Sequence, residues 1–311
     1  MLSNKTHRGR FAPSPTGRMH LGNVMAALLS WLSVKSKGGV WVLRHEDLDP
    51  ERSRPEYAKQ IEDDLRWLGL TWDEGGLDNI GSYGPYLQSE RREVYNQMLR
   101  KLNDEQLLYP CFCTRADRLA ASAPHADDPK PQPCRCYGLT EQEKSELGKE
   151  RKASLKCRLT ETAVNCFVDD HYGLFQDSEP LRDPVVQRAD GAFAYQLAVV
   201  ADDAAMKITE VVRGCDLLSS TPLQIAMYAM LGLQVPTFSH HPLLCAADGR
   251  RLCKRDVAMH LGELRKDHSA NEVIGMVAHA LGLTPEATPI TPNELLPLFS
   301  WSKIPTKNII L

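Results

Sequence analysis

The sequence lacks the features that would place it in a membrane, in the secretory pathway or on bulk nucleic acid. Its 311 residues contain no apolar run close to the roughly 18–20 residues that cross a bilayer. The N-terminus, Met1 to Arg8, has no apolar core of the kind found in a secretory signal. The 37 Lys and Arg residues are balanced by 40 Asp and Glu, and the net charge of -3 excludes a broadly basic coat but not a local basic patch. We therefore expect a soluble, cytoplasmic protein without membrane contact.

Nine cysteines are present without an export signal, so we expect reduced thiols or metal ligands before disulfides. Four of them form two Cys-x-Cys pairs, Cys111-Phe112-Cys113 and Cys134-Arg135-Cys136, around a proline-rich loop. Four thiolates on two short knuckles suit a tetrahedral Zn²⁺; the alternative is buried free thiols, because cysteine often serves as a small hydrophobe. We predict one structural Zn²⁺ per chain. The other five cysteines are isolated and are expected to be structural: Cys157, Cys166, Cys215, Cys245 and Cys253.

Strand and helix patterns alternate along the chain. Apolar residues recur at helical spacing over 20–36, between short apolar stretches at 9–13 and 40–43 that are typical of buried strands. A second helix is expected from Pro55 to about Leu68. Farther along we expect strands at 193–200 and 208–213, a helix at 221–231 capped by Ser219 or Ser220, and a helix near 271–281. The order of the first elements predicts a parallel sheet with crossover helices.

The segment from Arg10 to Asn23 combines a strand, a glycine-containing turn and the start of a helix. Unpaired amides at a helix N-terminus favour a phosphate. His20 in the first turn can donate to phosphate oxygens, and Gly22 lets a flat nucleotide lie close to the backbone. The alternative is a plain strand-to-helix turn with an incidental histidine.

Two further charged segments are candidates for chemistry. Gly249 to Asp256 contains four cations. Such a segment can be a solvated face or a contact for RNA phosphates. It can also be a mobile loop in which Lys254 stabilises negative charge developing on a phosphate during transfer. Arg44 to Pro50 places three carboxylates directly after a strand, where they could bind Mg²⁺ or an ammonium group. The alternative for this acidic segment is a set of helix-start acids and a turn.

Together these segments resemble the class I aminoacyl-tRNA synthetases, and the glutamyl branch in particular. His20-Leu21-Gly22-Asn23 stands in the slot of the HIGH-type signature. Arg251-Leu252-Cys253-Lys254-Arg255 resembles the KMSKS-type loop, with Cys253 where serine is usual. The resemblance covers roughly residues 8 to 256 and includes three more stretches: Arg44 to Asp49, Phe193 to Ala198 followed by Asp202-Asp203, and Val212 to Leu217.

The resemblance implies roles for individual residues. His20, Gly22, Asn23 and Lys254 would contact ATP, which the family uses with Mg²⁺. His20 and Lys254 would be catalytic, with Lys254 stabilising charge on the α-phosphate as pyrophosphate leaves. The expected glutamate contacts are Arg10, Phe11, Ala12, Pro13, Ser14, Glu46 for the ammonium group, Tyr195 and Arg213.

The resemblance also bears on the zinc ligands. Short relatives in the glutamyl branch carry Cys-x-Cys followed by Tyr-x-x-x-Cys. Cys111, Cys113 and Cys134 fit the cysteine slots of this pattern, but the tyrosine slot falls on Lys130. That departure leaves the fourth ligand open, and we predict Cys136, with His125 or a water as alternatives.

The fold class implied by the resemblance is α/β. A Rossmann-like catalytic domain would comprise 1–108 and 175–245, with a zinc-binding, acceptor-type subdomain inserted at 109–174. A short, mostly helical C-terminal part, 246–311, would include the KMSKS-like loop. Only 57 residues follow Lys254, so we expect no separate anticodon-binding domain.

The length and the motifs together are most similar to the glutamyl-Q tRNA(Asp) synthetase family. Its members activate glutamate with ATP, without needing tRNA, and transfer it to the queuosine base in the anticodon of tRNA(Asp). The resemblance therefore implies L-glutamate, ATP and a queuosine-bearing anticodon stem-loop as partners, and we expect a monomer. Two alternatives stay open: a truncated glutamyl-tRNA synthetase charging a tRNA 3′ end, and a catalytically silent RNA-binding paralogue.

Overall fold

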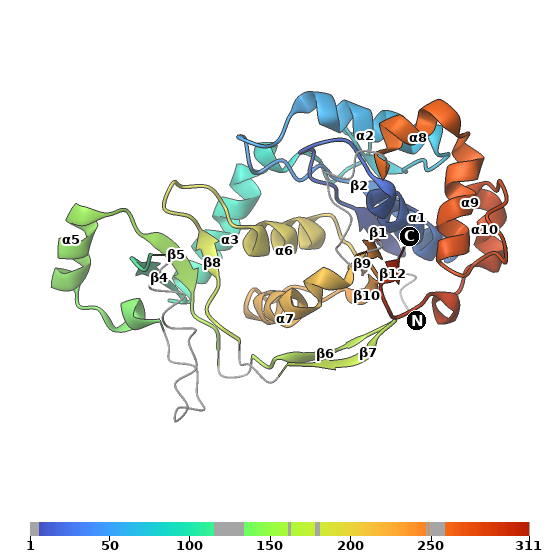
Figure 1. Ribbon diagram of the computed structural model, residues 1–311. Helices are drawn as coiled ribbons and strands as arrows, with labels where there is room; N and C mark the ends of the chain where they lie inside the picture. Colours follow the sequence, from blue (N-terminus) through green and yellow to red (C-terminus); the bar gives the residue numbers. More distant parts are fainter. Residues whose placement is uncertain are drawn as a thin grey trace.

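The centre of the molecule is a five-stranded parallel sheet. The computed structural model describes residues 6–114, 134–160, 163–177, 181–246, 248 and 259–310. The sheet has the order β10-β9-β1-β2-β3, and every neighbouring pair in it is parallel (Figure 1). This arrangement confirms the predicted α/β class with a Rossmann-like sheet. The strands are β1 Arg8–Phe11, β2 Val40–Leu43, β3 Glu74–Gly75, β9 Glu210–Gly214 and β10 Thr237–His241.

Helices bury both faces of this sheet because side chains alternate along each strand. Trp41 and Leu43 of β2 join one hydrophobic cluster, whereas Val42 between them joins the other. The first cluster contains α1 Leu21–Lys35, α2 Pro55–Trp67 and α9 Ala270–Ala280, and the second contains α3 Arg92–Asp104, α6 Tyr195–Ala205 and α7 Thr221–Met230.

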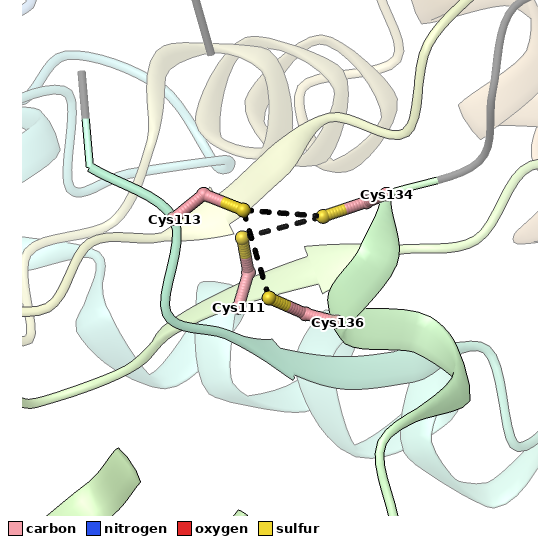
Figure 2. Close-up of side chains that lie close together, drawn as sticks. All are labelled: Cys111, Cys113, Cys134 and Cys136. Atoms are coloured by element: carbon pink, nitrogen blue, oxygen red, sulfur yellow. Dashed lines mark hydrogen bonds between the residues drawn. The ribbon is translucent and has the colours of Figure 1, made fainter. Parts of the chain in front are cut away.

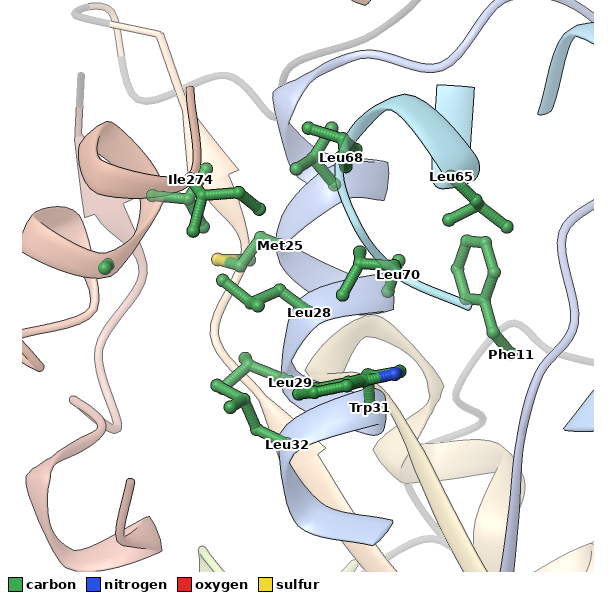
Figure 3. Packing of buried hydrophobic residues seen from close by; sticks show 14 of the residues in the cluster. Phe11, Met25, Leu28, Leu29, Trp31, Leu32, Leu65, Leu68, Leu70 and Ile274 are labelled. Atoms are coloured by element: carbon green, nitrogen blue, oxygen red, sulfur yellow. The ribbon is translucent and has the colours of Figure 1, made fainter. Parts of the chain in front are cut away.

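Helix α1 is the central helix of the first cluster. Its long apolar run is buried on nearly every side, with Leu28, Leu29 and Leu32 completely inaccessible to solvent. Figure 3 shows these side chains between Ile274 of α9 on one side and Leu70 on the other. The same helix starts at His20, so this packing holds the start of α1 against the sheet.

Two local predictions are corrected by the structure. The apolar stretch at 193–200 is not a strand, because Tyr195–Ala205 forms helix α6. A short run that is apolar on all sides does not distinguish a buried helix from a buried strand. Helix α7 begins at Thr221 as predicted, but Ser220 has a helical backbone and makes no side-chain capping bond.

A smaller antiparallel sheet lies at one end of the molecule, on the left in Figure 1. Its strands, in spatial order, are β4 Leu108–Cys111, β5 Ser154–Cys157 and β8 Val185–Gln187. The short helix η2 Arg135–Gly138 and helix α5 Glu141–Glu150 accompany it. Among the described residues, the hydrophobic cluster of this part has four buried members, two of which are cysteines: Tyr109, Cys111, Phe112 and Cys136. A core this small is typical of a unit that needs a metal or another cross-link.

A separate two-stranded hairpin, β6 Cys166–Asp169 and β7 Gly173–Gln176, packs on the large sheet. Phe167 of β6 meets Phe238 of β10 with ring centroids 6.0 Å apart. This contact places the end of β6 directly against β10, and the carboxylate of Asp169 consequently lies at the large sheet.

The C-terminal part is mostly short helices, as predicted. It contains α8 Leu261–Asp267, α9, α10 Pro292–Leu295 and two 3₁₀ turns, η5 Leu296–Leu298 and η6 Trp301–Lys303. It ends in strand β12 Ile309–Ile310, which pairs in parallel with β11 Leu244–Cys245. The last residues therefore return to the centre of the molecule. Within the described ranges, no helix has both the length and the apolar character to cross a membrane.

Candidate active site and metal centre

A cavity of about 150 Å³ opens where β1 runs into α1. His20, Gly22 and Asn23 form one wall, and the turn after β9, including Gly214 and Asp216, contributes to the opposite side. The remaining lining residues are Met25, Ala26, Leu217, His241, Leu243 and Leu244. The cavity thus lies at the C-terminal edge of a parallel sheet and beside a helix N-terminus, where nucleotides bind in such folds.

The geometry of His20 is set by the helix that it starts. The ring Nδ1 of His20 accepts a hydrogen bond from the backbone N–H of Gly22 at 3.1 Å. The backbone N–H of His20 donates to Oδ1 of Asn23 at 3.0 Å. Because Nδ1 is an acceptor, a neutral ring carries its proton on Nε2, as a donor. A Cβ at Gly22 would lie 2.9 Å from the His20 ring, so glycine is required to keep the ring in this position. Asn23 lines the cavity while its carbonyl oxygen completes the cap.

Lys254 and the rest of the KMSKS-like segment, Arg251 to Arg255, lie outside the described residues. The chain on both sides of this segment is described, and both flanks reach the His20 cavity. On one side Leu244 of β11 forms part of the cavity wall. On the other side His260 makes an antiparallel bridge with His20, and Leu261 N–H donates to the carbonyl of Met19 at 2.8 Å.

A second polar cluster contains Arg10, Glu46, Tyr195 and Arg213, the last of which directly precedes Gly214 of the cavity wall. Glu46 accepts from Nη2 of Arg44 at 3.1 Å, and burial raises its pKa even though the cations of Arg44 and Arg10 lower it. Burial also raises the pKa of the Tyr195 hydroxyl, as does the charge of Glu46, while Arg213 and Arg10 act in the opposite direction. These mutual influences show that the four predicted side chains share one electrostatic environment.

The guanidinium of Arg213 is buried, with 7% of the residue exposed, and its hydrogen-bond partners among the described residues are neutral side chains. Nε donates to Nε2 of His240 at 3.0 Å, Nη1 to Oε1 of Gln224 at 2.8 Å and Nη2 to Oγ1 of Thr221 at 2.7 Å. Burial lowers its pKa, but an arginine still keeps its charge at neutral pH. A buried cation without a bonded carboxylate is suited to bind the carboxylate of a ligand.

Two adjacent aspartates of α6 bind the other arginines of the site. Asp203 accepts from Nε of Arg10 at 3.2 Å and from Nη1 of Arg44 at 2.6 Å. Asp202 accepts from Nε of Arg91 at 2.5 Å and from the hydroxyl of Tyr95 at 3.0 Å. The opposite charges of Arg10 and Arg44 hold the pKa of Asp203 below its usual range despite its burial. These aspartates keep three guanidinium groups fixed inside the protein.

The segment after β1 is placed beside the site mainly through its backbone. Phe11 is buried and its ring stacks on Trp41, with centroids 6.1 Å apart, so the ring belongs to the core. The carbonyl of Pro13 accepts the backbone N–H of Glu46 at 3.0 Å. Ala12 is half-buried and Ser14 is exposed. Any contact of Phe11 with a ligand is therefore left to its backbone.

The acidic strand end does not gather into a metal site. Glu46 is bonded to Arg44, and Asp47 accepts from the backbone and hydroxyl of Ser89 at 2.8 and 2.6 Å. Asp49 accepts the N–H of Glu51, as expected of a turn. Among the described residues, the one group of His, Cys, Asp and Glu side chains close enough to hold a metal is the cysteine cluster.

The cysteine cluster brings together the two Cys-x-Cys pairs (Figure 2). The Sγ atoms lie 3.6 Å apart for Cys111 and Cys134, 3.8 Å for Cys113 and Cys134, and 3.6 Å for Cys113 and Cys136. Four sulfurs placed about 2.3 Å from a tetrahedral Zn²⁺ would lie about 3.8 Å from one another. A disulfide would need about 2.0 Å. The four residues thus fit a metal such as Zn²⁺, and Cys136 occupies the fourth corner; His125 lies outside the described residues.

The other predicted structural cysteines are free thiols wherever they are described: Cys157, Cys166, Cys215 and Cys245. Burial raises the pKa of Cys157 to about 12, which keeps that thiol protonated and inert. Cys253 lies outside the described residues.

Several residues of the site were not predicted as functional. Arg44, Asp202 and Asp203 belong to motifs that were recognised, but no role was assigned to them. The polar partners of Arg213 carry no sequence signal. His240 meets Arg213 because β10 lies beside β9. Thr221 and Gln224 lie in α7, and they reach the guanidinium because this helix packs near the end of β9. Strand order in a sheet is a long-range property that a local pattern does not contain.

Comparison with known proteins adds independent findings. Residues 7–294 match the model of the family described as tRNA synthetases class I (E and Q), catalytic domain. The chain is 46% identical to a glutamyl-Q tRNA(Asp) synthetase of Symbiobacterium thermophilum, over 97% of this chain and 94% of that protein. It is 45% identical to a protein of the same name from Nitratidesulfovibrio vulgaris, over 97% of this chain and 95% of the relative.

A solved structure shows the same architecture. The crystal structure of a glutamate tRNA ligase from Elizabethkingia meningosepticum, in complex with its amino acid, superposes with a TM-score of 0.81 at 27% identity. The match covers 98% of this chain and 67% of that chain. The solved ligase therefore contains additional chain beyond the part that this fold matches.

Proposed function

The chain belongs to the class I tRNA synthetases of the E and Q type, which are ligase-type enzymes. On this premise we propose that it activates L-glutamate with ATP and transfers it to queuosine in the anticodon of tRNA(Asp). The observation that carries the first half is the buried Arg213 guanidinium with neutral partners, in one electrostatic cluster with Glu46 and Tyr195. Such a cluster offers a cation for a carboxylate and an acceptor for an ammonium group.

Activation requires that the glutamate α-carboxylate attack the α-phosphorus of ATP. A carboxylate oxygen–phosphorus bond forms, and the bond to the pyrophosphate oxygen breaks. His20, with its proton on Nε2, would donate to the ATP phosphates at the cavity. Lys254 would stabilise the charge developing on the α-phosphate, with Gly22 and Asn23 shaping the nucleotide site. These groups act by position and charge, and no covalent enzyme intermediate is needed.

Arg10, Glu46, Tyr195 and Arg213 would hold the amino acid, with the backbone of Phe11 to Ser14 beside them. Glu46 would accept from the ammonium group, leaving the two arginines for the carboxylates. The class uses ATP with Mg²⁺, which offsets charge on the phosphates when it is bound. Tyr195 has 37% of its surface exposed, and we assign glutamate entry to this solvent-exposed side of the cluster.

The choice of queuosine as acceptor is supported by the relatives. Two proteins named for that activity match this chain along almost their whole length, whereas the solved glutamate tRNA ligase is covered only to 67%. We assign the cytoplasm, a monomer and tRNA-independent activation as parts of the same proposal. The division into 1–108 with 175–245, 109–174 and 246–311 also stays a prediction.

A local basic surface is available for RNA beside the cysteine cluster. A cavity of about 450 Å³ is lined by Arg151, Lys152 and Arg188 together with Cys113. Asp190 pairs with Arg188 at 2.6 Å and offsets one of these charges. The cations suit RNA phosphates, and they agree with the small, local patch that the near-neutral net charge allows.

The decisive experiment compares two acceptors. We expect labelled glutamate to transfer to queuosine-containing tRNA(Asp) and not to the same tRNA without queuosine. Glutamate-dependent ATP–pyrophosphate exchange should proceed without tRNA. Equal labelling of both tRNAs at the 3′ end, with pyrophosphate exchange that requires tRNA, would instead identify a truncated glutamyl-tRNA synthetase. The absence of any pyrophosphate exchange would indicate the catalytically silent paralogue.

The cysteine cluster gives a second prediction, because we assign it one structural Zn²⁺ bound by Cys111, Cys113, Cys134 and Cys136. Metal analysis should find about one zinc per chain in the wild type. Cys136→Ser should lower zinc retention during dialysis against a chelator, whereas Cys157→Ser, outside the cluster, should not. Full zinc retention in Cys136→Ser would exclude Cys136 as the fourth ligand, and a zinc-free wild type would refute the site.

A further inference from the structure

Three buried side chains from three separate strands form a continuous hydrogen-bonded chain. Asp169 ends β6, His240 lies in β10 and Arg213 lies in the neighbouring strand β9. Oδ2 of Asp169 lies 2.6 Å from Nδ1 of His240, and Nε2 of His240 lies 3.0 Å from Nε of Arg213. Asp169 and His240 are 1% and 0% exposed, so these contacts are shielded from bulk solvent. The predicted amino-acid ligand Arg213 is thus linked to two residues that the proposed mechanism does not use.

The proton positions in this chain follow from its chemistry. Asp169 also accepts the backbone N–H groups of His171 at 3.0 Å and Tyr172 at 2.9 Å. Although burial alone would raise its pKa, these bonds and the one from His240 hold the pKa of Asp169 below its usual range. An ionised carboxylate only accepts, so Nδ1 of His240 must carry the proton. Burial lowers the pKa of His240, which keeps the ring neutral and leaves a lone pair on Nε2.

The lone pair on Nε2 of His240 determines whether Arg213 can form a hydrogen bond there. An arginine side chain has five N–H donors and no acceptor, so it can bond His240 only if Nε2 is unprotonated. In the other neutral tautomer, or in the imidazolium, two donors would face each other across 3.0 Å. Thr221 and Gln224 take one donor from each terminal nitrogen, and Gln224 is itself oriented by Gln196 at 2.8 Å. The described residues thus leave two donors, one on each terminal nitrogen, for a ligand.

We propose that His240, held by Asp169 as the Nδ1–H tautomer, is a positioning residue that orients the Arg213 guanidinium for the carboxylate of glutamate. The inference rests on the proposed function and deepens it. A neutral acceptor at Nε fixes the plane of the guanidinium and leaves its positive charge uncompensated. A carboxylate at the same place would neutralise that charge. The full charge and the two remaining N–H donors are then left for the substrate.

Two substitutions of His240 separate orientation from packing. In His240→Gln the side-chain carbonyl can replace Nε2 as the acceptor for Arg213. In His240→Asn the shorter amide reaches only the Nδ1 position, so the acceptor is lost. We expect His240→Asn to raise the KM for glutamate by about ten- to a hundredfold in pyrophosphate exchange, with kcat and the KM for ATP close to wild type. His240→Gln should restore most of the glutamate affinity.

The outcomes are distinguishable. Wild-type exchange combined with an unchanged glutamate KM in His240→Asn would overturn the role of His240 and leave the proposed function intact. Equal increases in the Asn and Gln variants would assign the effect to packing and also overturn it. Absence of glutamate-dependent exchange in the wild type would overturn the proposed function together with this role.

A second variant covers the case in which His240→Asn fails to fold. In Asp169→Asn the neutral amide no longer requires a proton on Nδ1, and ¹⁵N NMR of the histidine rings should show the change from a single Nδ1–H tautomer to a mixture. The glutamate KM should rise in parallel. A wild-type His240 protonated on Nε2 in the NMR spectrum would contradict the proposal directly.

Discussion

Replacing Asp203 by alanine is expected to lower the free energy of unfolding by about 3–5 kcal/mol, because it breaks a buried ion pair on one side only. The carboxylate of Asp203 bonds both Arg10 and Arg44, and its side chain is 2% exposed. Its loss leaves two guanidinium groups inside the protein with less compensating charge. Urea unfolding measures this loss of stability. Glutamate-dependent ATP–pyrophosphate exchange at low temperature should be lost as well, because Arg10 and Glu46 belong to the same network of charges as Asp203.

An exposed ion pair supplies the control. Glu93 bonds Arg100 on the surface of α3, with both side chains more than half exposed, so Glu93→Ala should leave the urea midpoint unchanged within error. Asp203→Asn, which keeps the shape but not the charge, should fall between the wild type and Asp203→Ala. A midpoint for Asp203→Ala equal to that of the wild type would show that the buried arginines do not need this carboxylate.

Replacing Lys254 by alanine should lower the kcat of pyrophosphate exchange by roughly 10²–10³-fold, the usual cost of removing one group that stabilises transition-state charge. The KM for glutamate should change little, because the glutamate cluster does not include this residue. Lys254 is assigned to the reaction because it stands in the KMSKS-like segment. Among the described residues before and after that segment, Leu244 lines the His20 cavity and His260 forms a β-bridge with His20.

The neighbouring cation Arg250 is the matched control for Lys254, since it lies in the same segment but outside the KMSKS-like slot. Arg250→Ala should retain nearly wild-type kcat. If both variants lost the same activity, general positive charge in the segment would be responsible and not one positioned lysine. Unchanged exchange in Lys254→Ala would refute the role assigned to it.

The parts of the site that could be predicted are those whose geometry depends on neighbours in the chain. The turn from β1 into α1 needs Gly22 two residues after His20 and Asn23 three residues after it, and all three lie within one helical turn. Both Cys-x-Cys knuckles are equally local, and only their meeting required the fold. The strand predicted at 193–200 is wrong for the converse reason, because the burial of Leu197 to Val200 comes from packing of α6 against α3 and α7.

The sequence by itself determined the parallel α/β body, the strand-to-helix turn at His20, the two Cys-x-Cys pairs and the resemblance to the glutamyl synthetases. Each of these depends on residue types at short, regular spacing. Only the tertiary structure decided which charges are compensated. Asp203 lies 193 residues from Arg10 along the chain, and Asp169 and His240 are 71 residues apart. The packing of α6 on the sheet and the strand order place such residues in contact, and burial strengthens the interactions between their charged and polar groups. The hydrogen-bond partners of Arg213 are therefore known only once β6, β9 and β10 are assembled.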